Sequence, residues 1–309
     1  HADENKITPM SFFKKLFGAS EEQPEEKAAK DAERRFNILC DDGLRAKQMG
    51  MADFAEKCFT EALEIKRELR VVGFLAEVQL MQQNYAAALP LLQELHAEEA
   101  GNLEIGLLLA NTYGETEDYE SMQQICTALA ESEAKEPRLL YLSAKAAHAL
   151  DKHEEALNFL DEAISERTDY AQAIQLRVQV LSALARYDEA LVDAERLIKE
   201  SPDHEDYALL QAETLAAAGR CAEAEAACQK VSELNPFNIE AHALLSRLAE
   251  QREDLAKAIT HCDDAIALQP ANPNLYDRRA ALFRKNNAPE AAEEDVKKAA
   301  DLRAGEHDK

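Results

Sequence analysis

HEEAL at residues 153–157 is followed 34 residues later by YDEAL at residues 187–191, a second run with the same pattern. Extending this register in both directions divides residues 36–306 into eight repeats. The repeats begin near residues 36, 69, 103, 137, 171, 205, 239 and 273. A fixed period of this length is typical of proteins in which one small helical or mixed unit is stacked many times.

Equivalent positions of the repeats carry equivalent residues. Position 20 holds Ala55, Ala88, Met122, Ala156, Ala190, Ala224, Ala258 and Ala292. Position 8 is small in seven of eight repeats: Gly43, Ala76, Ala110, Ala144, Val178, Ala212, Ser246 and Ala280. Small residues at fixed positions let two helix backbones approach closely. We therefore expect two helices to cross near positions 8 and 20 of every repeat.

Two segments of each repeat have apolar residues at the 3.6-residue period of an α-helix. Short breaks such as residues 150–152 and 218–220 separate the two segments, and proline at position 32 ends the second one in three repeats. One hairpin of helices cannot bury its own apolar face, but stacked hairpins form a continuous core. The predicted fold is all-α: a right-handed α-solenoid, or superhelix, of tandem helical hairpins.

These features resemble the tetratricopeptide repeat (TPR) family over about 274 of the 309 residues. The resemblance rests on the 34-residue period, the small position 8, Ala at position 20, and two further positions: the aromatic position 17 (Tyr85, Tyr119, Tyr187) and position 32 (Pro202, Pro236, Pro270). The chain departs from the family in lacking Trp at position 4 and in having Met122 at position 20, where we expect wider helix packing. The resemblance implies a non-catalytic scaffold that binds other proteins.

Composition and motifs exclude several other classes of function. The chain has 60 acidic and 35 basic residues and a net charge of −25, so nucleic acid is not an expected partner. No G-x-G-x-x-G, G-x-x-x-x-G-K, G-x-S-x-G or H-E-x-x-H pattern occurs. We therefore expect an acidic protein that is not an enzyme, has no catalytic residues and needs no cofactor.

The six cysteines indicate a reducing compartment. They form no C-x-x-C pair, and Cys221 and Cys228 would lie about 10 Å apart on one helix, too far for a disulfide. We therefore predict free thiols and a cytoplasmic protein. The run His261-Cys262-Asp263 could be a metal site, but Cys262 occupies an inward-facing position and packing is favoured, so no metal is predicted.

The TPR resemblance implies that positions 2, 5, 9 and 12 of the first helices line a concave groove. In repeats 3–5 these positions supply the predicted groove residues Asn111, Arg138, Tyr141, Lys145, His148, Gln175 and Gln179. This strip is amide-rich and locally basic, although residues 36–272 contain 44 acids and 20 bases. Such side chains suit the backbone of an extended peptide or protein segment. The alternative is that they are polar because they face water.

Two further predictions concern the same surface. Arg247, Asp277 and Arg284 belong to a secondary candidate groove on repeats 6 to 8. The carboxylate clamp of the chaperone-tail binders in the family is incomplete, because its corresponding pairs are Cys40 with Leu44 and Leu107 with Asn111. A role as a heat-shock co-chaperone is therefore not expected, and the identity of the protein partner stays open.

The N-terminal region is expected to differ from the repeats. Residues 1–9 have no periodicity and are interpreted as an added leader, whereas residues 10–35 are predicted to form an amphipathic segment and a capping helix. Apolar side chains of this segment cluster beside two lysines: Phe12, Phe13, Leu16 and Phe17. The cluster suggests an alternative function, a peripheral membrane-tethered adaptor or assembly factor. Three alternatives remain open for this cluster. It contacts a membrane weakly, it docks on a partner or on the chain itself, including by self-association, or it is disordered.

Overall fold

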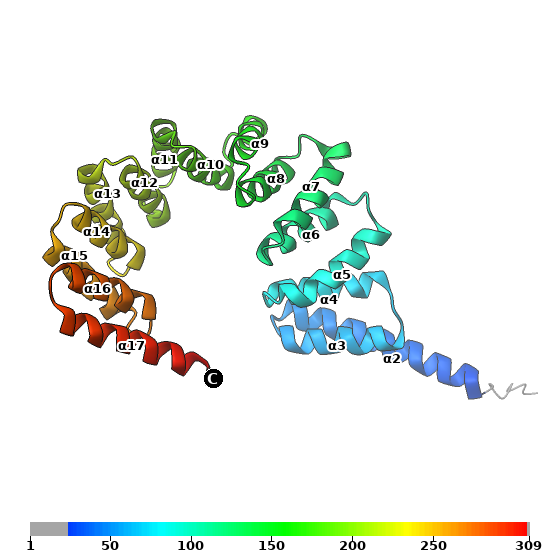
Figure 1. Ribbon diagram of the computed structural model, residues 1–309. Helices are drawn as coiled ribbons and strands as arrows, with labels where there is room; N and C mark the ends of the chain where they lie inside the picture. Colours follow the sequence, from blue (N-terminus) through cyan, green and yellow to red (C-terminus); the bar gives the residue numbers. More distant parts are fainter. Residues whose placement is uncertain (1–23, 308–309) are drawn as a thin grey trace, which may run out of the picture. The chain divides into compact units, whose positions relative to one another are not determined.

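The computed structural model describes residues 24–307, in which all regular secondary structure is helical (Figure 1). Helices that open a repeat are α2 (Pro24–Gln48), α4 (Leu69–Met81), α6 (Leu103–Glu115), α8 (Pro137–Ala149), α10 (Ala171–Ala183), α12 (Glu205–Ala217), α14 (Ile239–Gln251) and α16 (Pro273–Lys285). Helices that close a repeat are α3 (Ala52–Ile65), α5 (Tyr85–Glu98), α7 (Tyr119–Glu133), α9 (His153–Glu166), α11 (Tyr187–Glu200), α13 (Cys221–Leu234), α15 (Leu255–Leu268) and α17 (Pro289–His307). The prediction of an all-α solenoid of helical hairpins is confirmed.

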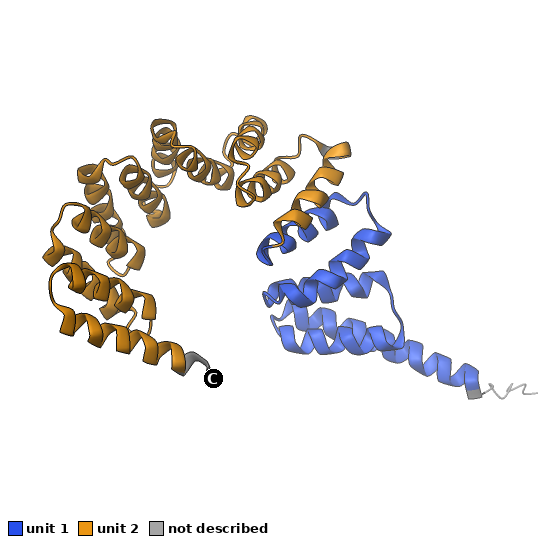
Figure 2. Ribbon diagram, in the orientation of Figure 1, with its two compact units in different colours: residues 1–117 blue, residues 118–309 orange. Residues whose placement is uncertain are grey.

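The chain divides into two compact units, residues 1–117 and 118–309 (Figure 2). The first unit contains the hairpins α2/α3 and α4/α5, followed by α6. The second begins with α7 and continues with five hairpins, from α8/α9 to α16/α17. The boundary falls inside repeat 3, the repeat in which Met122 occupies the position that holds alanine elsewhere.

Helix α2 begins 12 residues before Phe36, where the first repeat was placed. Its apolar side chains Phe36, Cys40 and Ala46 are buried against α3 and α4, whereas residues 25–35 are exposed. Residues 24–35 thus extend the first helix of repeat 1, and residues 25–35 of this extension face solvent. Within residues 24–307 no helix combines the length and the apolar character that a membrane span requires.

Small residues allow the two helices of each hairpin to pack closely. The seven alanines at position 20 are at most 1% exposed, and Met122 is fully buried. In the first repeat, a β-carbon on Gly43 would lie 2.6 Å from the Phe59 ring, so only glycine fits against that aromatic side chain. Close contact of the backbones therefore depends on side-chain size at these positions.

The turn between the helices of each repeat contains one residue in the left-handed region, always at position 15. These residues, with φ between 53° and 73°, are Gly50, Gln83, Glu117, Asp151, Ala185, Gly219, Glu253 and Asn287. In most of these turns the next N–H donates to the carbonyl five residues earlier, as from Lys152 to Ala147 at 2.8 Å. This hydrogen bond is that of a Schellman motif, which ends the first helix.

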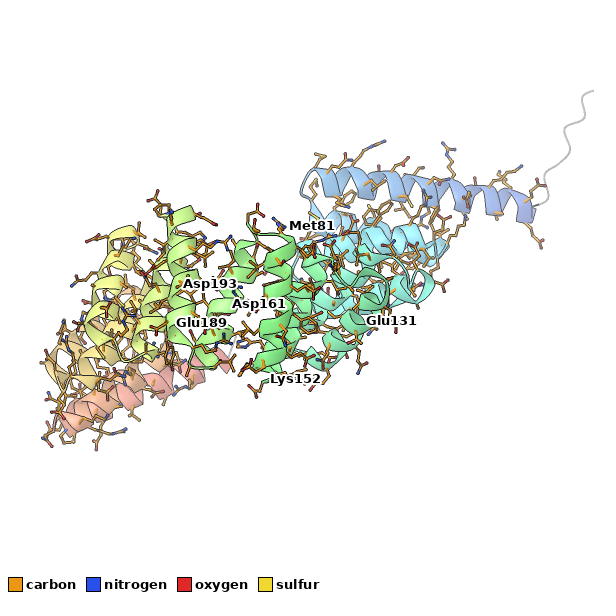
Figure 3. The ribbon with its side chains drawn as sticks, turned by 90° about the horizontal axis from the view of Figure 1, so that it is seen from above. Met81, Glu131, Lys152, Asp161, Glu189 and Asp193 are labelled. Carbon is orange, nitrogen blue, oxygen red and sulfur yellow. The ribbon has the colours of Figure 1, made fainter. Side chains whose placement is uncertain are left out.

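Buried arginine–aspartate clusters join neighbouring repeats at two places in the second unit. The guanidinium of Arg177 donates to both carboxylate oxygens of Asp193, at 2.7 and 2.8 Å, and to Asp161 at 2.8 Å. Figure 3 labels the two aspartates. Arg279 contacts Asp295 and Asp263 in the same way, at the same positions of repeats 7 and 8. Asp193 and Asp295 are each 5% exposed, so each needs its arginine.

Enlarging a buried alanine at position 20 should destabilise the protein. Ala224→Leu inserts three carbons into a fully buried contact of α13, and the overpacking should lower the free energy of unfolding by about 1–3 kcal/mol. The matched control is Ala226→Leu in the same helix, where the side chain is less buried and the change should stay within about 0.5 kcal/mol. Urea unfolding followed by circular dichroism measures both. Equal effects at the two sites would contradict the proposed register.

Removing the arginine of one cluster should lower the free energy of unfolding more than removing a surface ion pair does. Arg177→Met leaves the buried Asp193 carboxylate without its partner and should destabilise by about 3–5 kcal/mol. The double variant Arg177→Met/Asp193→Leu should recover much of this loss. Arg186→Met, which breaks an exposed pair with Glu189, should change the free energy of unfolding much less in the same urea titration, because water already solvates both charges. A small effect of Arg177→Met would show that this cluster does not hold the repeats together.

Candidate functional site

An open hollow of about 370 Å³ lies in the second unit, on the first helices of repeats 4 and 5. Its lining residues are Tyr119, Tyr141, Lys145, His148, Ala149, Gln172, Gln175, Leu176 and Gln179. Five residues of the predicted groove, on α8 and α10, are among them: Tyr141, Lys145, His148, Gln175 and Gln179. They come together because residues three and four apart share one face of a helix, and α8 and α10 present such faces side by side.

The hollow has a buried apolar and aromatic part and a polar rim. Leu176 is buried, and the Tyr141 ring packs against the ring of Tyr170 with centroids 5.5 Å apart. Burial raises the pKa of the Tyr170 hydroxyl, with a smaller contribution from Tyr141. Gln172 and Gln179 are exposed at the rim. The hollow therefore combines aromatic surface with amide groups that both donate and accept hydrogen bonds.

One lining residue of the hollow, His148, pairs with a second histidine. The Nδ1 atoms of His148, at the end of α8, and His153, at the start of α9, lie 3.1 Å apart. One imidazole must donate and the other accept, so this hydrogen bond exists only while at least one ring is neutral. Burial lowers the pKa of His148, His153 lowers it further, and Asp151 opposes the shift.

The remaining predicted groove residues lie elsewhere. Arg138 is exposed in the first turn of α8, where its Nε donates to the Glu136 carboxylate at 2.7 Å. Asn111 is exposed on α6 and belongs to the first unit. The apolar cluster Phe12, Phe13, Leu16 and Phe17 lies outside the described residues, as do residues 1–9. Tyr119, on α7, also lines the hollow, but the sequence analysis did not predict it as a groove residue. Its place at the aromatic position 17 was a signal that could have been used.

The three residues of the secondary candidate groove have different surroundings in the structure. Arg247 lines a separate hollow of about 290 Å³ together with Glu213 and Gln251. Asp277 instead accepts a hydrogen bond from Arg303, and Arg284 is exposed near the end of α16. Neither of these two residues lines the hollow that contains Arg247.

A hollow of the first unit was not predicted. It measures about 320 Å³ and is mostly apolar, with Phe74, Leu80 and Leu108 among its lining residues. Leu108 is 42% exposed, and the nearby helix end carries Met81 at 55%. No sequence signal distinguishes this hollow, because apolar residues at these positions are equally consistent with a buried core.

The cysteines are free, as predicted: five are buried and Cys221 is half-buried. Burial raises the pKa of Cys126 and of Cys228 to about 11, so both thiols stay protonated at neutral pH.

A chain of tandem helical hairpins is an α-solenoid repeat protein. Two sequence profiles of the tetratricopeptide repeat match the chain, one at residues 79–146 and 183–248 and the other at residues 137–170, together a little over half of its length. The chain belongs to the tetratricopeptide repeat family, which confirms the resemblance seen in the sequence. No curated protein matches it in sequence.

Solved structures share this fold at low sequence identity. A tetratricopeptide repeat protein from Parabacteroides merdae ATCC 43184 has 16% identity and a TM-score of 0.70, over 81% of this chain and 99% of that chain. The Cut9–Hcn1 hetero-tetramer of the APC/C has 15% identity and a TM-score of 0.53, over 90% of this chain and 54% of that chain. YrrB, described as a TPR protein with an unusual peptide-binding site, has 18% identity and a TM-score of 0.46, over 58% of this chain and 92% of that chain.

Stability should fall in mild acid, partly through His148. Its pKa is lowered in the folded protein, so the folded state binds fewer protons than the unfolded state, whose histidines titrate near pH 6.5. The stabilisation is therefore present above about pH 6.5 and is lost as the pH falls below it. Urea unfolding at about pH 7.5 and about pH 5 should show a smaller loss of stability in His148→Gln than in the wild type. His204→Gln, at an exposed histidine, is the control and should keep the loss seen in the wild type. An unchanged loss in His148→Gln would contradict this assignment.

Proposed function

We propose that this protein is a non-catalytic scaffold that binds an extended segment of another protein, one that carries one or a few acidic residues. The proposed site is the hollow between α8 and α10 in the second unit. The observation that carries the proposal is that Lys145 shares one hollow with three glutamines, Gln172, Gln175 and Gln179. Glutamine side chains hold backbone amides of a peptide without requiring a particular sequence.

Charge supports an acidic ligand. Among the described residues that line the hollow, Lys145 is the one with a permanent charge. The whole chain carries a net charge of −25, so this hollow differs in sign from the chain as a whole. A charge-assisted hydrogen bond to lysine contributes more than a neutral one, and long-range repulsion from the acidic surface would favour ligands with few, well-placed acids.

The aromatic side chains add apolar contact area. Tyr141 is half-buried and held by Tyr170, so it offers a fixed ring face at a low entropic cost. Tyr119 supplies a second aromatic side chain from α7. A ligand with an apolar residue close to an acidic one fits this arrangement. The free, buried cysteines support a cytoplasmic location, where thiols stay reduced.

A peptide selection tests the proposal even though the partner is unidentified. A random peptide library displayed on phage is selected on the purified full chain, and the enriched peptides are synthesised and titrated by calorimetry. We expect enrichment in Asp and Glu, and at least tenfold weaker binding to Lys145→Glu/Gln179→Ala, because one charge-assisted bond contributes about 1.5–3 kcal/mol.

The control is Lys199→Glu, which changes the net charge equally at an exposed position on α11. It should bind the selected peptides as the wild type does. Circular dichroism spectra of all variants should match that of the wild type, so that a loss of binding is not a loss of folding. Selected peptides that bind the hollow variant with unchanged affinity would overturn the proposal.

A further inference from the structure

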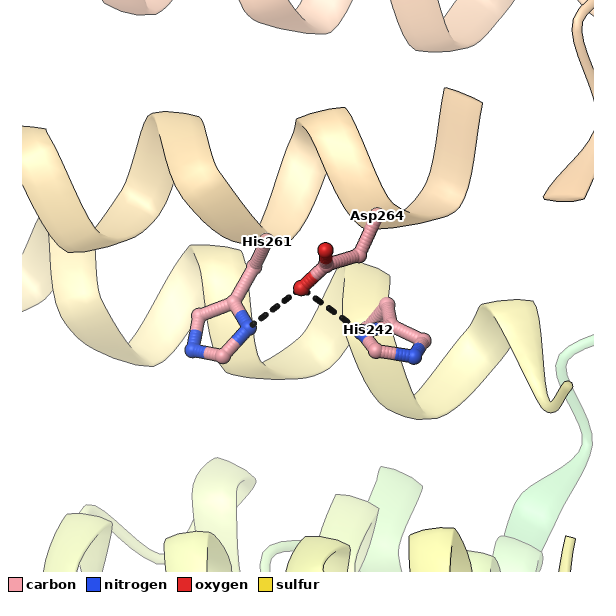
Figure 4. Close-up of side chains that lie close together, drawn as sticks. All are labelled: His242, His261 and Asp264. Carbon is pink, nitrogen blue, oxygen red and sulfur yellow. Dashed lines mark ion pairs between the residues drawn. The ribbon is translucent and has the colours of Figure 1, made fainter. Parts of the chain in front are cut away.

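Repeat 7 brings together three side chains that bind metal ions in many proteins, away from the hollow described above. His242 lies on α14, and His261 and Asp264 lie one turn apart on α15, facing it (Figure 4). One nitrogen of each imidazole and one oxygen of the carboxylate lie within 4.8 Å of one another.

Three of the four imidazole nitrogens are buried without a hydrogen-bond partner among the described residues. Nδ1 of His242 is 3.7 Å from Oδ2 of Asp264, and Nδ1 of His261 is 3.9 Å from the same oxygen. Both distances exceed the 2.7–3.2 Å or so of a hydrogen bond. Nδ1 of His242 and both nitrogens of His261 are nevertheless buried without a hydrogen-bond partner. Buried polar atoms of this kind need an explanation, and a metal ion bound between them is one.

Packing does not account for the histidine on α14. His242 occupies position 4 of its repeat, where four other repeats of the second unit place buried apolar or aromatic residues: Leu140, Ile174, Ala208 and Tyr276. At that position, repeat 7 alone of these five has a side chain that commonly binds a metal ion. Its partners His261 and Asp264 come from the facing helix of the same hairpin.

The residues between the two α15 ligands are already engaged elsewhere. Cys262 is buried, and its Sγ lies 3.2 Å from Oγ of Ser246. Asp263 accepts a hydrogen bond from Arg279 at 2.6 Å. The adjacent run His261-Cys262-Asp263, which suggested a metal site in the sequence, is therefore not the ligand set. The structure replaces it with a set drawn from two helices.

We propose that His242, His261 and Asp264 bind one Zn²⁺ ion. Zinc takes imidazole nitrogen and carboxylate oxygen at about 2.0–2.2 Å in a tetrahedral arrangement, which places ligand atoms about 3.3 Å apart. The two nitrogen–oxygen separations are 3.7 and 3.9 Å, and one ligand atom of each residue lies within 4.8 Å of the others. Side-chain rotations that bring these atoms closer together would give the tetrahedral spacing. Two imidazoles in the set disfavour Mg²⁺ and Ca²⁺, which prefer oxygen ligands.

The surroundings allow an ion to enter. The Asp264 side chain is 51% exposed, whereas those of His242 and His261 are 16% and 17% exposed. An ion can thus reach the site from the solvent side of α15, with water as the fourth ligand. Bound there, it would connect α14 to α15 and stabilise repeat 7.

Zinc titration of the full chain, prepared without a histidine tag, tests this site. A chromophoric zinc chelator competes for the ion, and thermal unfolding is followed with and without Zn²⁺. We expect one tight equivalent per chain and a higher unfolding midpoint with zinc. His261→Ala and Asp264→Asn should each weaken binding at least tenfold and abolish the rise of the midpoint. Asp264→Asn changes an exposed side chain, so it tests the site even if His261→Ala folds poorly.

Two control variants test whether zinc binds at this site or at other histidines of the chain. His204→Ala removes an exposed histidine that stacks on Tyr207, and His148→Ala/His153→Ala removes the other close histidine pair. Both should bind zinc as the wild type does. The proposal is overturned if the wild-type chain binds no zinc at equimolar concentration, if Asp264→Asn binds it equally well, or if the binding disappears with the His148/His153 pair instead.

Discussion

Close approach of two helix backbones within each hairpin is the constraint on which the rest of this structure depends. The fully buried or nearly buried alanines at position 20 make that approach possible, and Gly43 shows the limit, since a β-carbon there would clash with Phe59. Once the hairpins are closed, their outer faces repeat every 34 residues, and a surface feature is built by choosing residues at equivalent positions. The hollow on α8 and α10 and the histidine cluster of repeat 7 are two surface features that differ from the equivalent positions of other repeats.

Much of the fold could be predicted, because the same local requirement recurs in every repeat. Helices α4, α6, α8, α10, α12, α14 and α16 begin at residues 69, 103, 137, 171, 205, 239 and 273, the residues at which the sequence register places repeats 2–8. What the register could not show was the division at Glu117, since a repeat pattern treats all neighbours as equivalent. It also missed the left-handed residue of each turn, because Gln83, Glu117, Ala185 and Glu253 are not the glycines that such a backbone favours.

The candidate sites were only partly predictable, for a physical reason. Tyr141, Lys145 and His148 lie on one helix face, which residue spacing alone can reveal. Asn111 was grouped with Lys145 although the two belong to different units. His242 and Asp264 are 22 residues apart on two helices, and their proximity depends on how those helices rotate against each other, which no spacing rule gives. By contrast, the 16-residue intervals around Arg177 and Arg279 were a readable signal, since the same three residue types recur at the same positions.

The two arginine–aspartate clusters also make the second unit uneven along its length. Arg177 joins repeats 4 and 5, and Arg279 joins repeats 7 and 8, but the equivalent residues of repeats 6 and 7 are Gln211 and Leu245. In a nearest-neighbour description of a repeat array, each interface contributes its own coupling free energy, and cooperativity is lost first where that coupling is smallest. The interfaces on either side of repeat 6 lack this arginine-centred coupling among the described residues, so local opening within this unit has a natural starting point in its interior as well as at its ends.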